Sequence, residues 1–207
     1  MSISRRISIR WLPAPASEPT STLVLTSPAR RFIDIRLTPP TPSPSHPQSL
    51  YWGFTGLSSN PTPTSGRWTH EVDSRGVSGF DEGSLSTLPN GDVLENGSMV
   101  DFDDADAGAK AYEEVWRDEE SATVVVLEEV DGAGGRVVRV GEWCHGLIAR
   151  DKAVHVERWR DGVCVFRSAG TLAREIVPPD VWKHEELAMG RVLQHADVVW
   201  KVVELHL

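Results

Sequence analysis

Apolar and polar residues alternate along much of this chain, as they do in β-strands that present two different faces. At the start, Ile3, Ile7 and Ile9 are separated by Ser and Arg side chains. Short β-branched runs follow at 22–25 and 32–37, each bounded by Pro or Ser. The pattern predicts short strands in this part of the chain.

The second half of the chain shows the pattern more clearly. An Asp-Gly pair at 161–162 is a typical hairpin turn, and residues 131–135 also predict a turn. Residues 181–187 predict one or two helical turns. Strands are expected at 123–130, 136–140, 141–149, 153–160, 163–168, 172–176, 191–193 and 197–207. Regularly spaced strands with hairpin signals between them are typical of antiparallel barrels and sandwiches.

Loops are marked by Pro, Gly, Asn and Asp. Residues 38–49 are rich in Pro and small polar residues and predict an exposed, extended loop, and residues 58–66 have the same character. Asn-Gly pairs predict turns at 89–91 and 95–97, because Asn and Gly tolerate positive φ. The acidic stretch 101–106 predicts a further loop.

Residues 109–120 allow two interpretations. Their Ala, Glu and Lys content suits a helix, but Tyr112, Val115 and Trp116 form only a weak helical face. We favour a strand over 112–117.

A faint internal repeat bears on the architecture. An aromatic, Gly-containing segment follows a β run in both halves, at 51–56 and at 142–146. The repeat favours two small barrels of similar topology over one large sheet. We therefore expect an N-terminal barrel half at 1–120 and a C-terminal barrel half at 121–207.

Charge and composition narrow the choice of partners and compartment. The chain has 21 Lys and Arg against 30 Asp and Glu, a formal net charge of −9. A surface of this sign repels phosphate groups, so we expect neither nucleic acid nor a membrane as partner. Two cysteines are too few for a secreted disulfide scaffold, and no export signal is recognisable. We expect a cytoplasmic protein, with the nucleus left open. Exposed edge strands would allow a homodimer.

Four segments resemble a known family. They are LYWGFTG at 50–56, the acidic stretch at 95–120, GEWCHGLIARD at 141–151 and WKVVELH at 200–206. In this order they resemble the fungal protein HRI-one family. The resemblance implies a mainly β fold of two lipocalin-like antiparallel β-barrels in tandem, with little helix. It implies no settled biochemical activity.

No motif of metal, nucleophilic or phosphate chemistry is present. The seven histidines lack zinc-site spacing, and there is no Cys-x-x-Cys. A cluster of Cys144, His145 and Cys164 is open to consideration, but structural zinc sites supply four ligands. There is no G-x-S-x-G, and the Gly-rich turn at 131–135 lacks the lysine of a phosphate loop. We expect no metal and no cofactor.

Acid–base chemistry depends on which side chains face the inside of a barrel. Because alternate residues of a strand share a face, Tyr112, Glu114 and Trp116 are expected on one face. A carboxyl group held among aromatic rings would have a raised pKa and could act as an acid or a base. The candidate catalytic residues are Tyr112, Glu142 and Arg158, although solvent exposure is the commoner fate of a charged residue.

Eight tryptophans are spread over both halves of the chain. Most are expected to fill the cores, but small barrels also enclose apolar ligands behind aromatic walls. The candidate ligand-binding residues are Trp52, Trp116, Trp143 and Trp159. The first functional hypothesis is a non-catalytic barrel that binds a small hydrophobic ligand or a protein partner. The alternative is a cofactor-independent isomerase or cyclase acting on a hydrophobic metabolite.

Overall fold

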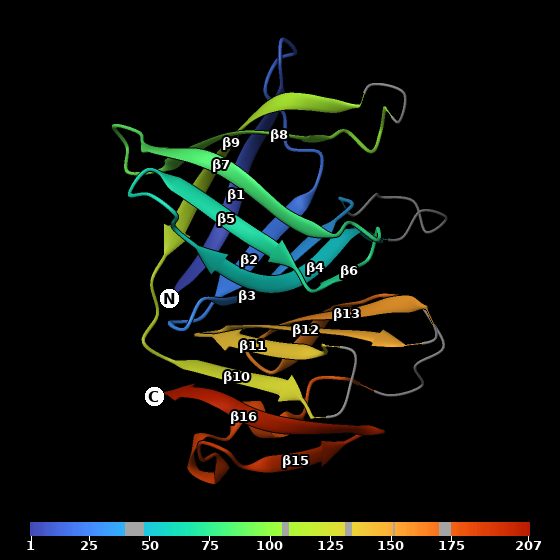
Figure 1. The fold of residues 1–207 in the computed structure, drawn as a ribbon. Coiled ribbons are helices and arrows are strands. Elements are labelled where there is room, and N and C mark those ends of the chain that lie inside the picture. Colours follow the sequence, from blue (N-terminus) through green and yellow to red (C-terminus); the bar gives the residue numbers. More distant parts are fainter. Residues whose placement is uncertain (40–47, 105–107, 131–133, 151, 170–174) are drawn as a thin grey trace.

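The computed structural model describes residues 1–39, 48–104, 108–130, 134–150, 152–169 and 175–207. Within them the chain forms two antiparallel β-sheets, one above the other in Figure 1. The expected loop at 38–49, the turn at 131–135 and the strand at 172–176 lie partly outside the described residues. No helix in the described part of the chain is long and apolar enough to cross a membrane.

The first sheet closes on itself into an eight-stranded barrel. The ring runs β1-β2-β3-β4-β5-β7-β8-β9 and returns to β1, and the short β6 pairs with β4. The strands are β1 (Ser2–Trp11), β2 (Ser21–Thr26), β3 (Arg31–Leu37), β4 (Leu50–Ser59), β5 (Ser65–His70), β6 (Val72–Asp73), β7 (Gly79–Thr87), β8 (Val93–Val100) and β9 (Ala109–Glu119).

The second sheet has seven strands in the order β14-β13-β12-β11-β10-β16-β15. Among the described residues no pairing joins β14 to β15, so this sheet, at the place of the expected second barrel, has two edges. Its strands are β10 (Val124–Glu129), β11 (Arg136–Val140), β12 (Trp143–Arg150), β13 (Ala153–Arg160), β14 (Val163–Arg167), β15 (Val192–His195) and β16 (Val198–His206). The prediction of a mainly β, antiparallel protein with little helix is confirmed.

The two sheets share one hydrophobic core. The outer face of the barrel contributes Ile33 and Ile35 from β3, and the second sheet contributes Val126, Val138 and Leu147. All five side chains are fully buried. The chain passes from the first sheet to the second between Glu119 and Val124, close to the boundary expected at 120–121. The division into two barrel halves stays a prediction.

The far face of the second sheet is covered by the segment that follows residue 174. Ile176, Val177 and Val181 pack against Val125 and Trp200 of that face. The segment contains two 3-10 helices, η2 (Pro179–Trp182) and η3 (His184–Glu186), as the pattern at 181–187 predicted.

Buried polar contacts fix the barrel on the second sheet. The carboxylate of Glu204 accepts hydrogen bonds from Ser27 Oγ at 2.6 Å, from the Ala29 amide at 2.9 Å and from Arg31 Nη1 at 3.0 Å. On β13, Arg158 Nη2 donates to the carbonyl of Ile35 at 2.6 Å. These bonds join β16 and β13 to the β2–β3 hairpin, so the two sheets have one defined orientation.

Two local expectations had different outcomes. The favoured strand at 112–117 is confirmed as part of β9. The expected turn at 95–97 is wrong, because these residues lie within β8. Gly97 is needed there for packing: a Cβ added to it would lie 2.4 Å from the hydroxyl oxygen of Tyr112 on the neighbouring strand.

Candidate functional site

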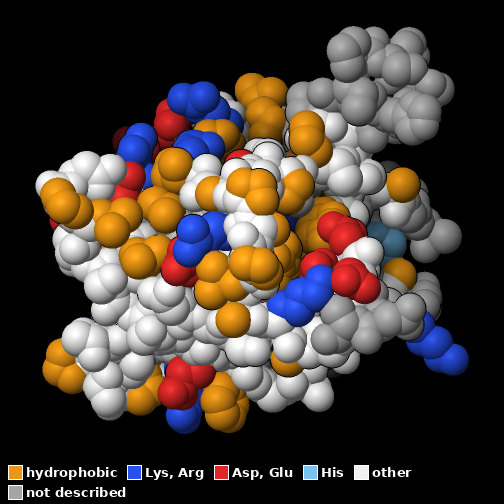
Figure 2. Space-filling view, turned by 90° about the horizontal axis from the view of Figure 1, so that it is seen from above, with side chains coloured by type: hydrophobic (Ala, Val, Ile, Leu, Met, Phe, Trp, Pro, Cys, Tyr) orange, Lys and Arg blue, Asp and Glu red, His pale blue; other side chains and the backbone are white. Residues whose placement is uncertain are grey.

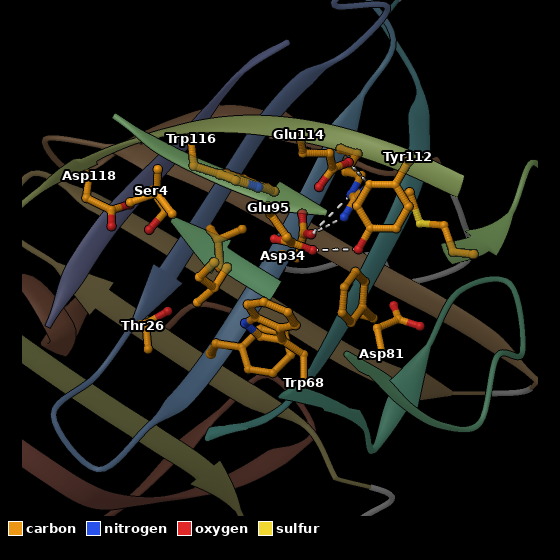
Figure 3. A pocket seen from close by; sticks show the side chains of 17 residues that line it. Ser4, Thr26, Asp34, Trp68, Asp81, Glu95, Tyr112, Glu114, Trp116 and Asp118 are labelled. Atoms are coloured by element: carbon orange, nitrogen blue, oxygen red, sulfur yellow. Dashed lines mark hydrogen bonds and ion pairs between the residues drawn. The ribbon is translucent and has the colours of Figure 1, made fainter. Parts of the chain in front are cut away.

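A cavity of about 140 Å³ lies inside the barrel (Figure 3). Aromatic side chains from four strands form much of its wall: Phe32, Phe54, Trp68 and Trp116. An apolar cavity of similar volume can bind benzene in other proteins. The space therefore suits a ligand of about one substituted aromatic ring.

Strand alternation places polar side chains in this cavity. On β3, Phe32, Asp34 and Arg36 face inward, while Ile33 and Ile35 face the core shared with the second sheet. Both faces of β3 are therefore buried. Its apolar residues hold the strand between the two sheets, and its alternate positions hold charges inside the barrel.

Two guanidinium groups neutralise part of the buried negative charge. Arg36 Nη2 donates to Asp34 Oδ2 at 2.9 Å, and its Nη1 lies 3.4 Å from Glu114 Oε1. Arg6 Nη1 donates to the same Glu114 oxygen at 2.5 Å. The guanidinium of Arg36 also lies 4.7 Å from the ring centroid of Trp52, in cation–π contact. Glu114 thus has two cationic partners, Arg6 and Arg36.

Glu95 on β8 has a neutral partner. The hydroxyl of Tyr112 donates to Glu95 Oε1 at 2.5 Å, and both side chains are buried. Burial and the nearby Glu114 carboxylate raise the pKa of Glu95 to about 8, although the Tyr112 hydrogen bond and Arg36 act in the opposite direction. Burial, together with Glu95 and Glu114, also raises the pKa of Tyr112. A carboxyl group that changes protonation state near neutral pH lies in the cavity wall.

Two polar atoms of the cavity wall have no hydrogen-bond partner in the described structure: Asp34 Oδ1 and Trp116 Nε1. Burial raises the pKa of Asp34, although Arg36 opposes this. Buried polar groups are rarely left without a partner, because the lost hydration is costly. One acceptor and one donor are thus available to a molecule in the cavity.

A buried histidine supports one side of the cavity. His70 Nδ1 lies 2.7 Å from Asp73 Oδ2, and its Nε2 lies 3.0 Å from Asp81 Oδ2. Asp81 lines the cavity. The imidazole stacks on Phe54 with ring centroids 4.4 Å apart and an interplanar angle of 7°. Burial lowers the pKa of His70, but the two carboxylates raise it more, to about 9. A charged imidazole at neutral pH therefore holds Phe54 and Asp81 in place.

Three candidate residues lie inside the barrel. Tyr112 and Trp116 line the cavity together with Glu114, so the face predicted for β9 is present. Trp52 is buried at the other end of the barrel, beside a smaller cavity of about 30 Å³. Its Nε1 donates to Asp73 Oδ2 at 2.9 Å. The catalytic and binding roles of these residues stay predictions.

The other four candidates lie outside the barrel interior. Glu142, placed in a strand by the sequence, lies in the turn before β12 and pairs with exposed Arg160. Trp143 packs on the shared core, and Trp159 on the far face of the second sheet. Arg158 donates to backbone carbonyls between the two sheets. None of these four residues lines the cavity.

The sequence did not identify Asp34, Arg36 or Glu95. Asp34 and Arg36 alternate with apolar residues in the run 32–37, and this alternation is the sequence signal that could have placed them on one face of the strand. Glu95 precedes an Asn-Gly pair, which predicts a turn and so gives no reason to place Glu95 inside a barrel. The cluster of Cys144, His145 and Cys164 considered from the sequence does not form. The Cys144 side chain packs in the core on the far face of the second sheet, whereas His145 points to the barrel, with its Nδ1 3.3 Å from the Ile33 carbonyl oxygen.

The comparisons with known proteins give a similar fold and a family. Among solved structures, the uncharacterized protein YLR301w from Saccharomyces cerevisiae is similar, with a TM-score of 0.76 and 18% sequence identity. The match covers 100% of this chain and 99% of the yeast chain. No curated protein matches. The family model described as Protein HRI1 matches residues 2–204. The chain belongs to the HRI1 protein family.

Proposed function

We propose that this protein is a non-catalytic binding protein that holds a small, largely apolar ligand inside the β1–β9 barrel. The observation that carries the proposal is the cavity of about 140 Å³, in which aromatic walls surround a buried, unpartnered carboxyl oxygen. Ligand sites are typically apolar pockets with a few polar groups that fix the ligand's orientation. The cavity has this composition.

Native mass spectrometry of the protein purified from its own host tests the proposal. We expect a stoichiometric small molecule that is released on denaturation. The variant Val93→Phe, which adds a ring at the half-buried edge of the cavity, should lose this molecule. The matched control Val165→Phe, on an exposed position of β14, should keep it. A clean apo mass for the wild type would overturn the proposal and direct the search to protein partners.

One observation favours a second candidate, a cofactor-independent isomerase or cyclase. Glu95 and Tyr112 share a hydrogen bond in the cavity wall, and the raised pKa of Glu95, about 8, suits proton transfer near neutral pH. Incubation of the released molecule with the protein, followed by mass spectrometry, separates the two functions. Conversion that Glu95→Gln abolishes would establish the enzyme, and an unchanged molecule would leave the binding protein.

A further inference from the structure

We infer that the ligand of the barrel cavity is a small organic cation, an amine carried on an aromatic or short apolar body. This inference rests on the proposed binding function and specifies its ligand class.

The first argument is the charge of the cavity wall. Five of the lining residues carry carboxyl groups, and Arg36 is the one guanidinium among the lining residues. From outside the lining, Arg6 pairs with Glu114 and His70 pairs with Asp81. The carboxyl groups belong to Asp34, Asp81, Glu95, Glu114 and Asp118. Asp118 is exposed, whereas Asp34 shares Arg36 with Glu114 and Glu95 has no ion pair in the described structure. A bound cation would supply positive charge to Glu95 and Asp34, the two buried lining carboxyl groups with no cationic partner of their own in the described structure.

The second argument is the pair of carboxyl groups that lack a full set of donors. Asp34 Oδ1 is buried and has no hydrogen-bond partner among the described residues. Glu95 receives a hydrogen bond from the neutral hydroxyl of Tyr112, and the ion pairs found in the described structure do not include it. Figure 3 shows both residues among the side chains that line the cavity. An ammonium group has three N–H donors and can satisfy more than one acceptor.

The third argument is the aromatic wall. Phe32, Phe54, Trp68 and Trp116 line the same cavity. The faces of such rings attract cations, and most strongly where water is excluded. They also offer an apolar surface to the rest of the ligand, and Trp116 Nε1 is free to donate to an acceptor on it. Carboxyl groups and aromatic faces together favour an aromatic amine over a fatty acid or other anion.

Binding of a cation should release a proton. The groups that face Glu95 are Asp81 from β7, Tyr112 and Glu114 from β9, and Arg36 from β3. Without ligand, burial and Glu114 keep Glu95 protonated through neutral pH, since its pKa is about 8. A bound ammonium would stabilise the carboxylate and displace that proton to solvent. By linkage, the affinity for an amine then rises with pH, by roughly tenfold or more between pH 6 and pH 8.

The experiment is isothermal titration calorimetry of the full chain with benzylamine and with its neutral analogue, benzyl alcohol. At pH 8 we expect benzylamine to bind at least tenfold more tightly than the alcohol, and its affinity to fall at pH 6. The variant Glu95→Gln should remove both the preference and the pH dependence. The control Glu82→Gln, an exposed carboxyl on β7 that pairs with Arg67, should retain both. If Glu95→Gln does not fold, Asp34→Asn is the second variant, and it should weaken the binding of benzylamine but not that of benzyl alcohol.

The outcomes separate this inference from the proposed function. If benzyl alcohol binds as tightly as benzylamine or more tightly, the inference of a cationic ligand is overturned, but the proposed binding function is not. If neither probe binds and the protein from its host carries a neutral or anionic molecule, the cation is again overturned. A cationic molecule on the native protein would support it. A clean apo mass would remove the proposed function and this inference together.

Discussion

Glu157 on β13 organises the segment that covers the far face of the second sheet. Its Oε1 accepts hydrogen bonds from Arg167 Nε at 2.9 Å and from the Ile176 amide at 3.1 Å. Its Oε2 accepts from Trp159 Nε1 at 3.0 Å and from the Val177 amide at 3.1 Å. The side chain is buried. We predict that Glu157→Gln strongly destabilises the protein.

The magnitude follows from the geometry. A glutamine keeps the shape of Glu157 but turns one acceptor oxygen into an amide nitrogen, so two of the four donors lose their acceptor in either orientation. One of these is always a buried backbone amide. Each lost buried hydrogen bond costs about 1–3 kcal/mol, so the free energy of unfolding should fall by about 3 kcal/mol in total. For a chain of this size the melting temperature should fall by roughly 6–12 °C.

Urea unfolding at pH 7, followed by tryptophan fluorescence, measures this loss. The matched control is Glu175→Gln, because Glu175 pairs with the same Arg167 at 2.8 Å but is exposed. Surface ion pairs contribute about 0–1 kcal/mol, so the control should stay close to the wild type. A loss of less than about 1 kcal/mol in Glu157→Gln would refute the assigned role of the four hydrogen bonds.

Three further predictions concern the barrel and the cysteines. Gly97→Ala should displace Tyr112, because the added Cβ would lie 2.4 Å from its hydroxyl oxygen, and should weaken the retention of bound molecule in native mass spectrometry. Since the pKa of His70 is raised to about 9, its contribution to the free energy of unfolding should be complete below pH 6.5 and be lost as the pH rises towards 9. His70→Gln should flatten that part of the profile in urea unfolding, and an unchanged slope would contradict the assignment. Ellman's reagent should label half-buried Cys164 in the native protein and spare Cys144, which is fully buried with a raised pKa.

The sequence predicted the local structure better than the site. Alternation identified most strands and the inward face of β9, because side-chain direction in a strand depends only on position parity. It did not identify Glu95, since the Asn-Gly pair beside it has turn propensity and only contact with Tyr112 explains Gly97 within a strand. Tertiary packing overrode local preference at this point.

The meeting of side chains across the barrel could not be predicted from one sequence. Asp34 and Glu95 share a cavity because ring closure places β3 and β8 on opposite sides of it, and closure is set by non-local strand pairing. Tryptophan content could not separate a cavity wall from a core. Trp116 lines the cavity, whereas Trp159 packs under the segment that covers the second sheet.

Closure of the barrel also has a consequence for folding kinetics. The ring is completed where β1 pairs with β9, in a register that places Ile3 opposite Glu119. Contacts between such distant residues form only after a large loss of chain entropy, and folds dominated by them are slow. Until β9 arrives, β1 exposes an unpaired strand edge that can pair with other chains. Refolding yield should therefore fall as protein concentration rises, with premature strand pairing between chains as the competing reaction.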